Sequence, residues 1–151
     1  MGNGGSDNLT NETKIVLKGR KVIGGVAEGE ALVSKVPVMG WGNVDMKRGV
    51  ITERDHPLKD IPLKGKVFVF PTPRGSGGWI FYGFTRFYDA NPIAMVYKKG
   101  LAITNLAAIV MNVPTVTDLD RDPTEVIDTG DHVKVDGDKG IVEVTKHRLK
   151  K

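Results

Sequence analysis

The stretch KVFVFPTPRGSGGWIFYGFTRFYD, residues 66–89, decides the fold that we expect for this chain. Its apolar residues 67–70 predict a buried strand, which ends at Pro71 and Pro73. Apolar side chains then recur at helical spacing over residues 79–88, which predicts a helix. The residues between the two elements are mostly glycines. The expected order is therefore strand, glycine-rich turn and helix.

The turn brings one hydroxyl group, that of Ser76, to the start of the expected helix. Free backbone N–H groups and the positive end of the helix dipole favour negative charge at such a position. Gly75, Gly77 and Gly78 let the backbone bend and let a ligand approach it, and Arg74 adds a cation. A serine that only caps the helix is the alternative. Three glycines and an arginine around one serine favour a functional site.

The composition indicates a single domain of short elements. The chain has 151 residues, of which 40% are hydrophobic, with 19 glycines and 8 prolines, so we expect many turns around one core. Strand patterns dominate both ends, and strands alternate with helices in the middle. This favours an α/β (mixed β/β/α) fold, a small barrel-like sheet with helices packed outside. The domain spans residues 14–146, between a disordered N-terminal tail, 1–13, and a basic C-terminal tail, 147–151.

Local patterns assign the other elements. Residues 43–63 are polar with two X-Pro pairs, which predicts a structured loop. Residues 106–111 are apolar on all sides, which predicts a short buried helix. Asp136 and Gly137 predict the turn of a hairpin. Further strands are expected at residues 15–17, 26–34, 93–97, 114–117, 130–135 and 140–145.

Several kinds of chemistry are excluded. With no cysteine in the chain, disulfides, thiolate catalysis and a self-contained iron–sulfur site are absent. His56, His132 and His147 have no metal-ligand spacing and are expected at the surface. The alternating acids at residues 118–122 lack the glycine and the final glutamate of a calcium loop.

The charge and the termini complete this picture. A net charge of +4 suits an anionic substrate, but no nucleic-acid-binding pattern accompanies it. There is no apolar run of membrane-spanning length and no signal-peptide core. We therefore expect a cytoplasmic protein without nucleic-acid or membrane partners.

Two segments resemble the swivelling β/β/α domain of the phosphohistidine enzymes. They are GLAITNLAAIVMNVPTV, residues 100–116, and TGDHVKVDGDKGIVEV, residues 129–144. Leu106 stands where that family has its histidine. Because leucine cannot act as the nucleophile, the architecture is expected without the phosphotransfer chemistry.

A closer resemblance covers residues 15–144. It is to the small, serine-bearing subunit of the aconitase X group, another family of swivelling domains, and the Arg-Gly-Ser-Gly turn is its most specific feature. The matching segments are GRKVIGGVAEGEALVS, GWGNVD, KVFVFPTPRGSGGW, AAIVMNVPTV and VDGDKGIVEV.

This resemblance implies one subunit of a hydro-lyase that dehydrates mevalonate 5-phosphate to trans-anhydromevalonate 5-phosphate, in isoprenoid biosynthesis. Ser76 would accept the proton, and Arg74, Gly75, Gly77 and Gly78 would bind substrate or stabilise the oxyanion. A large subunit would supply the cysteines of an iron–sulfur cluster, the Lewis acid of the reaction, so this chain alone would be inactive.

Alternatives remain open at this point. The first alternative is a related hydro-lyase that acts on another small acid, such as hydroxyproline. The second is a non-catalytic swivelling module that only binds a partner or a ligand. Trp79, Phe81 and Tyr82 belong either to the subunit interface or to the core.

Overall fold

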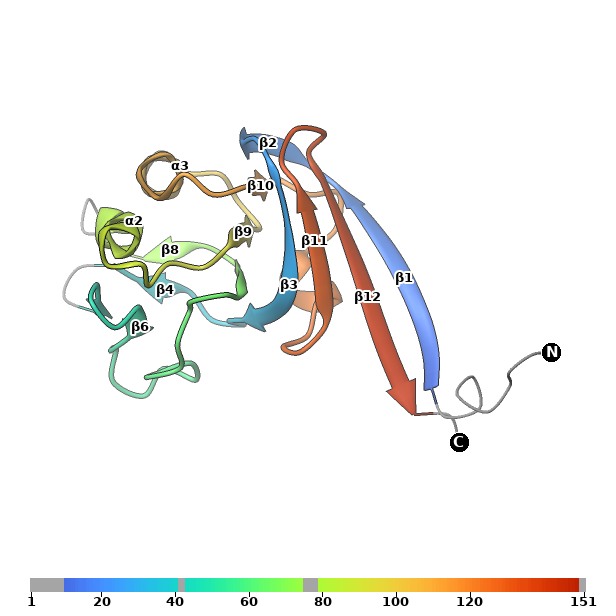
Figure 1. Ribbon diagram of the computed structural model, residues 1–151, viewed down its shortest axis with the longest axis horizontal. Coiled ribbons are helices and arrows are strands. Elements are labelled where there is room, and N and C mark those ends of the chain that lie inside the picture. The colour runs from blue at the N-terminus through green and yellow to red at the C-terminus, as the bar shows by residue number, and fades with distance from the viewer. Residues whose placement is uncertain (1–9, 41–42, 75–78, 150–151) are drawn as a thin grey trace.

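The structure is a computed structural model that describes residues 10–40, 43–74 and 79–149. Within these residues, the main sheet has 8 strands in the order β1-β12-β11-β3-β7-β9-β10-β2 (Figure 1). Their bounds are β1 Thr10–Lys18, β2 Arg20–Ile23, β3 Val26–Val33, β7 Val67–Phe70, β9 Ala94–Tyr97, β10 Thr115–Thr117, β11 His132–Asp136 and β12 Ile141–Leu149.

The centre of the sheet is parallel and its sides are antiparallel. Strands β3, β7, β9 and β10 pair in parallel, whereas β11, β12, β1 and β2 pair antiparallel. The predicted strand over residues 67–70 is confirmed as β7, and all four of its residues are buried. Both faces of a parallel strand are covered in such folds, which is why its sequence is continuously apolar.

Each face of β7 and β9 packs against a separate core. Phe68 and Phe70 lie in the core beneath the helices. Val67 and Val69 lie in a second core, together with the buried valines of β11 and β12. The antiparallel strands therefore curl over the face of the parallel strands that the two main helices leave open.

The first strand crosses from one edge of the sheet to the other. It pairs with β12 as β1 and, after Gly19, with β10 as β2. A Cβ atom on Gly19 would lie 2.5 Å from the Thr117 carbonyl oxygen, so only glycine fits this crossing. The sheet closes into the barrel-like form expected from the sequence, with helices outside it.

The antiparallel pair of β1 and β12 is longer than the expected domain. Thr10 pairs with Leu149 at its outer end, so paired strands extend past the expected boundaries at residues 14 and 146. In Figure 1 this strand pair projects from the right-hand side of the molecule. Residues 1–9 and 150–151 lie outside the described part.

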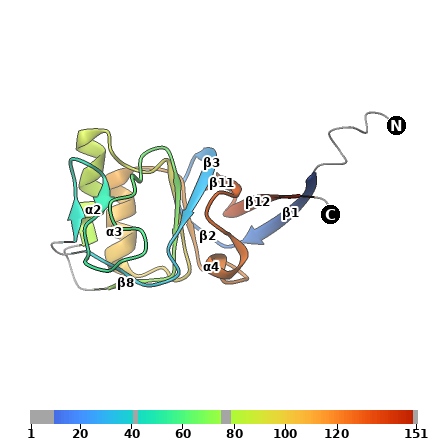
Figure 2. The ribbon, with the colours of Figure 1, turned by 90° about the horizontal axis from the view of Figure 1, so that it is seen from below.

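Among the described residues, three α-helices and one 3-10 helix accompany the sheets (Figure 2). α2, Ile80–Phe84, continues as the 3-10 helix η2, Thr85–Tyr88, and packs beside α3, Ala102–Met111. α4, Pro123–Val126, lies on the opposite side of the parallel strands. None of the described helices has the length and apolar content needed to cross a membrane.

The helix predicted at residues 106–111 differs from α3 in two respects. α3 begins earlier, at Ala102, because the Thr104 hydroxyl bonds back to the Leu101 backbone instead of capping a later start. It is also not buried on all sides, since Leu106 is 49% exposed and Ile109 is 59% exposed. Only the face that carries Ala107, Ala108 and Met111 is covered.

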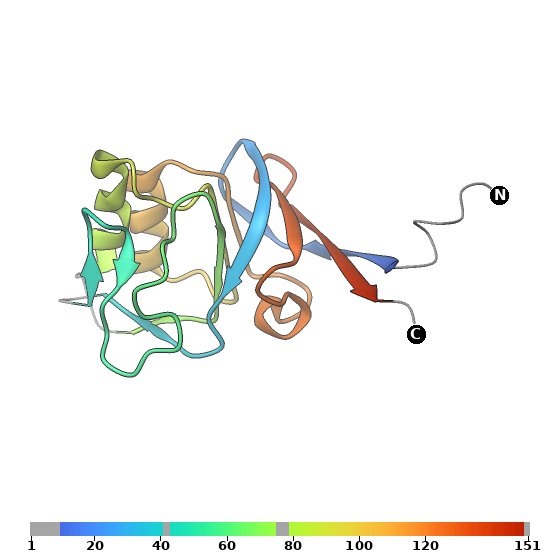
Figure 3. The ribbon, with the colours of Figure 1, turned by 60° about the horizontal axis from the view of Figure 1, so that its bottom comes forward.

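Two small sheets occupy the expected loop region and its surroundings (Figure 3). β4, Val38–Met39, pairs in parallel with β8, Pro73–Arg74. β5, Val44–Asp45, pairs antiparallel with β6, Val50–Ile51. The β5–β6 hairpin brings the rest of the loop, residues 52–63, back toward β8.

Candidate active site

The serine-bearing segment, residues 75–78, lies in the sequence between β8 and α2. Gly75, Ser76, Gly77 and Gly78 are outside the described residues, whereas Arg74 before them and Trp79 after them are described. β4 and β8 are parallel, and the Gly40 N–H donates to the Arg74 carbonyl at 3.3 Å. The chain therefore enters the turn from the same edge at which β4 ends.

Trp79 anchors the far end of the turn. Its side chain is fully buried, and its indole Nε1 donates to the Val38 carbonyl at 2.9 Å. Its ring stacks on Phe70, with centroids 5.0 Å apart, and contacts Tyr82 at 4.3 Å. The Tyr82 hydroxyl donates to the Met39 carbonyl at 2.9 Å. Trp79 and Tyr82 thus belong to the core, and both tie α2 to β4.

Arg74 closes the near end of the turn and pairs with an acid from the loop. Its Nη2 lies 3.1 Å from Glu53 Oε2. The Arg74 side chain is 49% exposed, whereas that of Glu53 is 19% exposed. A guanidinium has five N–H donors, so this contact leaves donors on the exposed side of Arg74.

A buried histidine lies behind this ion pair. His56 is 6% exposed, so the surface position expected for it was wrong, whereas His132 and His147 are exposed. The Leu58 N–H donates to His56 Nδ1 at 3.0 Å, which leaves the proton on Nε2, 3.4 Å from Ser34 Oγ.

The electrostatics keep His56 neutral. Burial lowers its pKa, and the charge of Arg74 acts in the same direction. Glu53 and the Pro37 carbonyl act against this shift, but burial is the largest effect. The imidazole therefore contributes no positive charge near Glu53.

Ser34 and His56 do not form a nucleophile and its base. The Ser34 hydroxyl donates to the Val36 carbonyl at 2.6 Å and is fully buried. His56 Nε2 carries its own proton and cannot accept another from Ser34. The pair is a packed, hydrogen-bonded support for residues 52–63.

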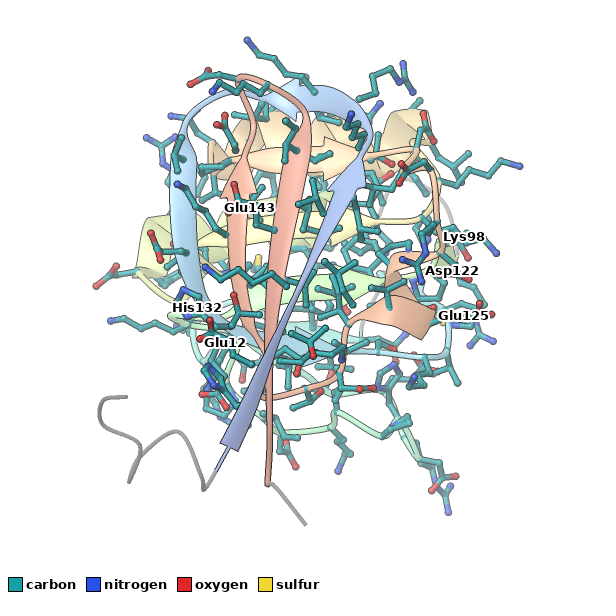
Figure 4. All side chains as sticks on the ribbon, turned by 90° about the vertical axis from the view of Figure 1, so that its right-hand side faces the viewer. Glu12, Lys98, Asp122, Glu125, His132 and Glu143 are labelled. Atoms are coloured by element: carbon teal, nitrogen blue, oxygen red, sulfur yellow. The ribbon has the colours of Figure 1, made fainter. Side chains whose placement is uncertain are left out.

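The acids of residues 118–122 are used in local contacts. Asp118 pairs with Arg20 and accepts from the Gly100 N–H, and Asp122 pairs with Lys98 at 3.2 Å. Asp118, Asp122 and Lys98, together with Lys99 and residues 119–121, line a cavity of about 310 Å³. Figure 4 shows Lys98 and Asp122 together beside α4. The residues that line this cavity include neither Arg74 nor Trp79, which flank the serine-bearing segment.

The chain does not fit an iron–sulfur cluster. Thiolates are the usual ligands of such clusters, and the sequence has no cysteine. Within the described ranges, no three His, Asp or Glu side chains are grouped so that they could hold a metal ion.

Arg74 was a predicted site residue, and the structure places two neighbours beside it, Glu53 and His56, that the sequence did not indicate. Glu53 lies 21 residues before Arg74, and no motif or periodicity links the two. The only available signal was the pair of X-Pro steps in residues 43–63, which indicated an ordered loop but not its contacts.

A mixed sheet with a parallel centre, closed into a barrel and covered by helices outside it, defines a swivelling β/β/α domain. The family model described as the aconitase X swivel domain matches residues 16–144. The chain belongs to this family.

Curated relatives and a solved structure agree with this assignment. The phosphomevalonate dehydratase small subunit of Methanosarcina acetivorans is 38% identical over 134 residues, which cover 87% of this chain and 92% of the relative. That of Thermococcus kodakarensis is 35% identical over 130 residues, 85% of this chain and 95% of the relative. The crystal structure of Thermococcus kodakaraensis aconitase X in its holo-form aligns with a TM-score of 0.79 and 33% identity, and covers 86% of this chain and 98% of that chain.

Proposed function

We propose that this chain is the small subunit of a cytoplasmic phosphomevalonate dehydratase, which converts mevalonate 5-phosphate to trans-anhydromevalonate 5-phosphate. The observation that carries the proposal is the identity of 35–38% to small subunits of that name along most of the chain. The Arg-Gly-Ser-Gly sequence at residues 74–77, between β8 and α2, adds a residue-level reason for it.

In the proposed reaction, Ser76 accepts the proton from the carbon beside the substrate carboxylate. A free serine hydroxyl is a poor base, so the site must stabilise its oxyanion. The candidate donors are the N–H groups of Gly77 and Gly78 and the guanidinium of Arg74, which can instead bind the carboxylate or phosphate of the substrate. Each such donor contributes about 3–4 kcal/mol in a site from which water is excluded. The partly exposed Arg74, fixed at the end of β8, supports this assignment.

The proposed partner is a large subunit that supplies the cysteines of the iron–sulfur cluster. The apolar surface of the helical layer supports a protein partner. α2, η2 and α3 carry Arg86 as their single charged residue, and Phe87, Leu106 and Ile109 on them are between 49% and 68% exposed. Depletion of charge and enrichment of aromatic residues are typical of interface centres.

The test is to purify the complex of this chain with its large subunit and to measure dehydration. Ser76→Ala is compared with Ser6→Ala, a serine outside the residues that the family model matches. Loss of a general base costs about 10²–10⁴-fold in rate, so Ser76→Ala should lose that factor and Ser6→Ala none. Size-exclusion chromatography checks that both variants still assemble.

Four outcomes contradict parts of the proposal. A Ser76→Ala complex with the wild-type rate removes Ser76 as proton acceptor. Dehydration by the isolated chain removes the need for the partner. A complex that dehydrates hydroxyproline but not mevalonate 5-phosphate points to a related hydro-lyase, and a complex inactive on a panel of hydroxy acids points to a binding module.

A further inference from the structure

The carboxylate of Glu53 is only half satisfied. Oε2 receives the hydrogen bond from Arg74, but Oε1 is buried and has no hydrogen-bond partner among the described residues. Buried carboxylate oxygens in folded proteins are nearly always paired. A carboxylate held this way costs stability, which points to a role other than holding the fold together.

Arg74 is the counter-charge of Glu53, because the other polar neighbours of this carboxylate, His56 and Tyr82, are neutral. His56 is neutral, because its Nδ1 is occupied by the Leu58 N–H and its Nε2 proton faces Ser34. Tyr82 donates its proton to the Met39 carbonyl; burial raises the pKa of its hydroxyl, and Glu53 adds to that shift. Among the described residues, the ion pair of Glu53 is with Arg74.

Glu53 itself is held by the loop that precedes it. The Thr52 N–H donates to the Asn43 carbonyl at 2.9 Å, directly beside the β5–β6 pair. The His56 N–H donates to the Glu53 carbonyl at 3.2 Å. The carboxylate therefore contacts Arg74 from a fixed backbone, and it limits the rotamers that the long Arg74 side chain adopts.

We propose that Glu53 is a positioning residue that holds the Arg74 guanidinium with its free N–H groups toward the anionic group of the substrate. The proposal rests on the function proposed above. A guanidinium oriented in advance loses less side-chain entropy when it binds an anion. The alternative is that the pair only ties the loop to β8, in which case its loss would affect stability but not substrate affinity.

The first experiment measures KM and kcat of the two-subunit complex with mevalonate 5-phosphate. The variants are Glu53→Gln, Arg74→Lys and the double variant, with Glu30→Gln as the control. Glu30 forms a comparable pair with Lys66, at 2.7 Å, on another part of the surface. We expect Glu53→Gln to raise KM about 10-fold with a smaller change in kcat, which is typical of lost ground-state binding, and Glu30→Gln to change neither.

The double variant tests whether Glu53 acts through Arg74. If it does, Glu53→Gln adds little to the effect of Arg74→Lys, because residues in one network are not additive. Glu53→Asp, which keeps the charge, should recover part of the affinity. An unchanged KM in Glu53→Gln, or effects of the two substitutions that simply multiply, would overturn the proposal.

A second measurement is independent of catalysis. NMR titration of the isolated chain follows His56, whose pKa is raised by the charge of Glu53 and lowered by that of Arg74. Glu53→Gln should lower the His56 pKa further, and Arg74→Gln should raise it. A His56 pKa that does not move in Glu53→Gln overturns the proposal even in an active enzyme. If the isolated chain shows the expected shift in the His56 pKa but the complex has no dehydratase activity, the proposed function is overturned. The role of Glu53 toward the substrate is then overturned as well, whereas the ion pair between Glu53 and Arg74 is upheld.

Discussion

Replacement of Trp79 by Phe tests whether the residue that follows the turn is an anchor in the core. The substitution removes the indole N–H that bonds the Val38 carbonyl at 2.9 Å and shortens a fully buried ring. The smaller ring costs about 1 kcal/mol in lost packing. A buried carbonyl without its donor costs about 1–3 kcal/mol. Together they predict a loss of about 2–4 kcal/mol in the free energy of unfolding.

Urea denaturation of the full chain, followed by circular dichroism, measures this loss, and thermal unfolding gives a second value. A domain of this size changes its Tm by about 2–4 °C per kcal/mol, so the expected decrease is roughly 5–15 °C. Phe87→Ala is the matched control: Phe87 is an aromatic residue of the same helical segment but is 68% exposed, and exposed positions change stability by about 0.5 kcal/mol or less.

The result that would refute this reasoning is a Trp79→Phe chain as stable as the Phe87→Ala chain. Trp79 would then not be tied to β4 in solution, and the far end of the serine-bearing turn would lack the support described for it. A Trp79→Phe chain that is as stable as wild type but dehydrates more slowly in the complex would also refute the reasoning, because Trp79 would then affect the reaction without stabilising the core.

Three further predictions concern other parts of the molecule. Ile109→Glu adds charge to the exposed face of α3 and should weaken assembly with the large subunit at least 10-fold, while the stability of the isolated chain stays the same. Unchanged co-purification of the two subunits would place the interface elsewhere. Burial alone would lower the pKa of Lys146, but the hydrogen bonds that its ammonium group donates to Asp131 and Asp128 outweigh burial and raise that pKa. Lys146→Met therefore leaves a mostly buried Asp131 without its cation and should cost about 3 kcal/mol in the free energy of unfolding, which Asp131→Asn in the same chain should partly restore. The Gly100 N–H and the Arg20 side chain lower the pKa of Asp118, so its ionised form stabilises the fold above the unfolded pKa of 3.8 and this contribution is lost as the pH falls below that value. Asp118→Asn should therefore be less stable than wild type at neutral pH and equal to it in acid, which urea titrations across this pH range would measure.

The elements that were predicted correctly are those encoded by neighbouring residues. Residues 67–70 are apolar without interruption, and they form a strand with both faces covered. The hairpin around Asp136 and Gly137 followed from its turn residues and is present as β11 and β12. Such patterns need no knowledge of distant contacts, because strand pleat and turn geometry are local properties.

Three of the incorrect or open expectations concerned burial. His56 was expected at the surface, yet it lies 6% exposed under the loop. Residues 106–111 were expected to be buried on all sides, yet Leu106 and Ile109 face outward. Trp79 and Tyr82 were left between core and interface, and the hydrogen bonds to β4 place them in the core. Each of these depends on which distant segment covers the residue.

By itself, the sequence determined the buried strand that precedes Ser76 and the helix that follows it, the absence of cysteine ligands and the family to which the chain belongs. These follow from residue identity and from spacing along the chain. Only the tertiary structure decided that Glu53 meets Arg74 and that a neutral His56 lies behind them. The physical reason is that an ion pair and a pKa shift depend on distance and burial in space, which the fold brings about between segments that share no local pattern.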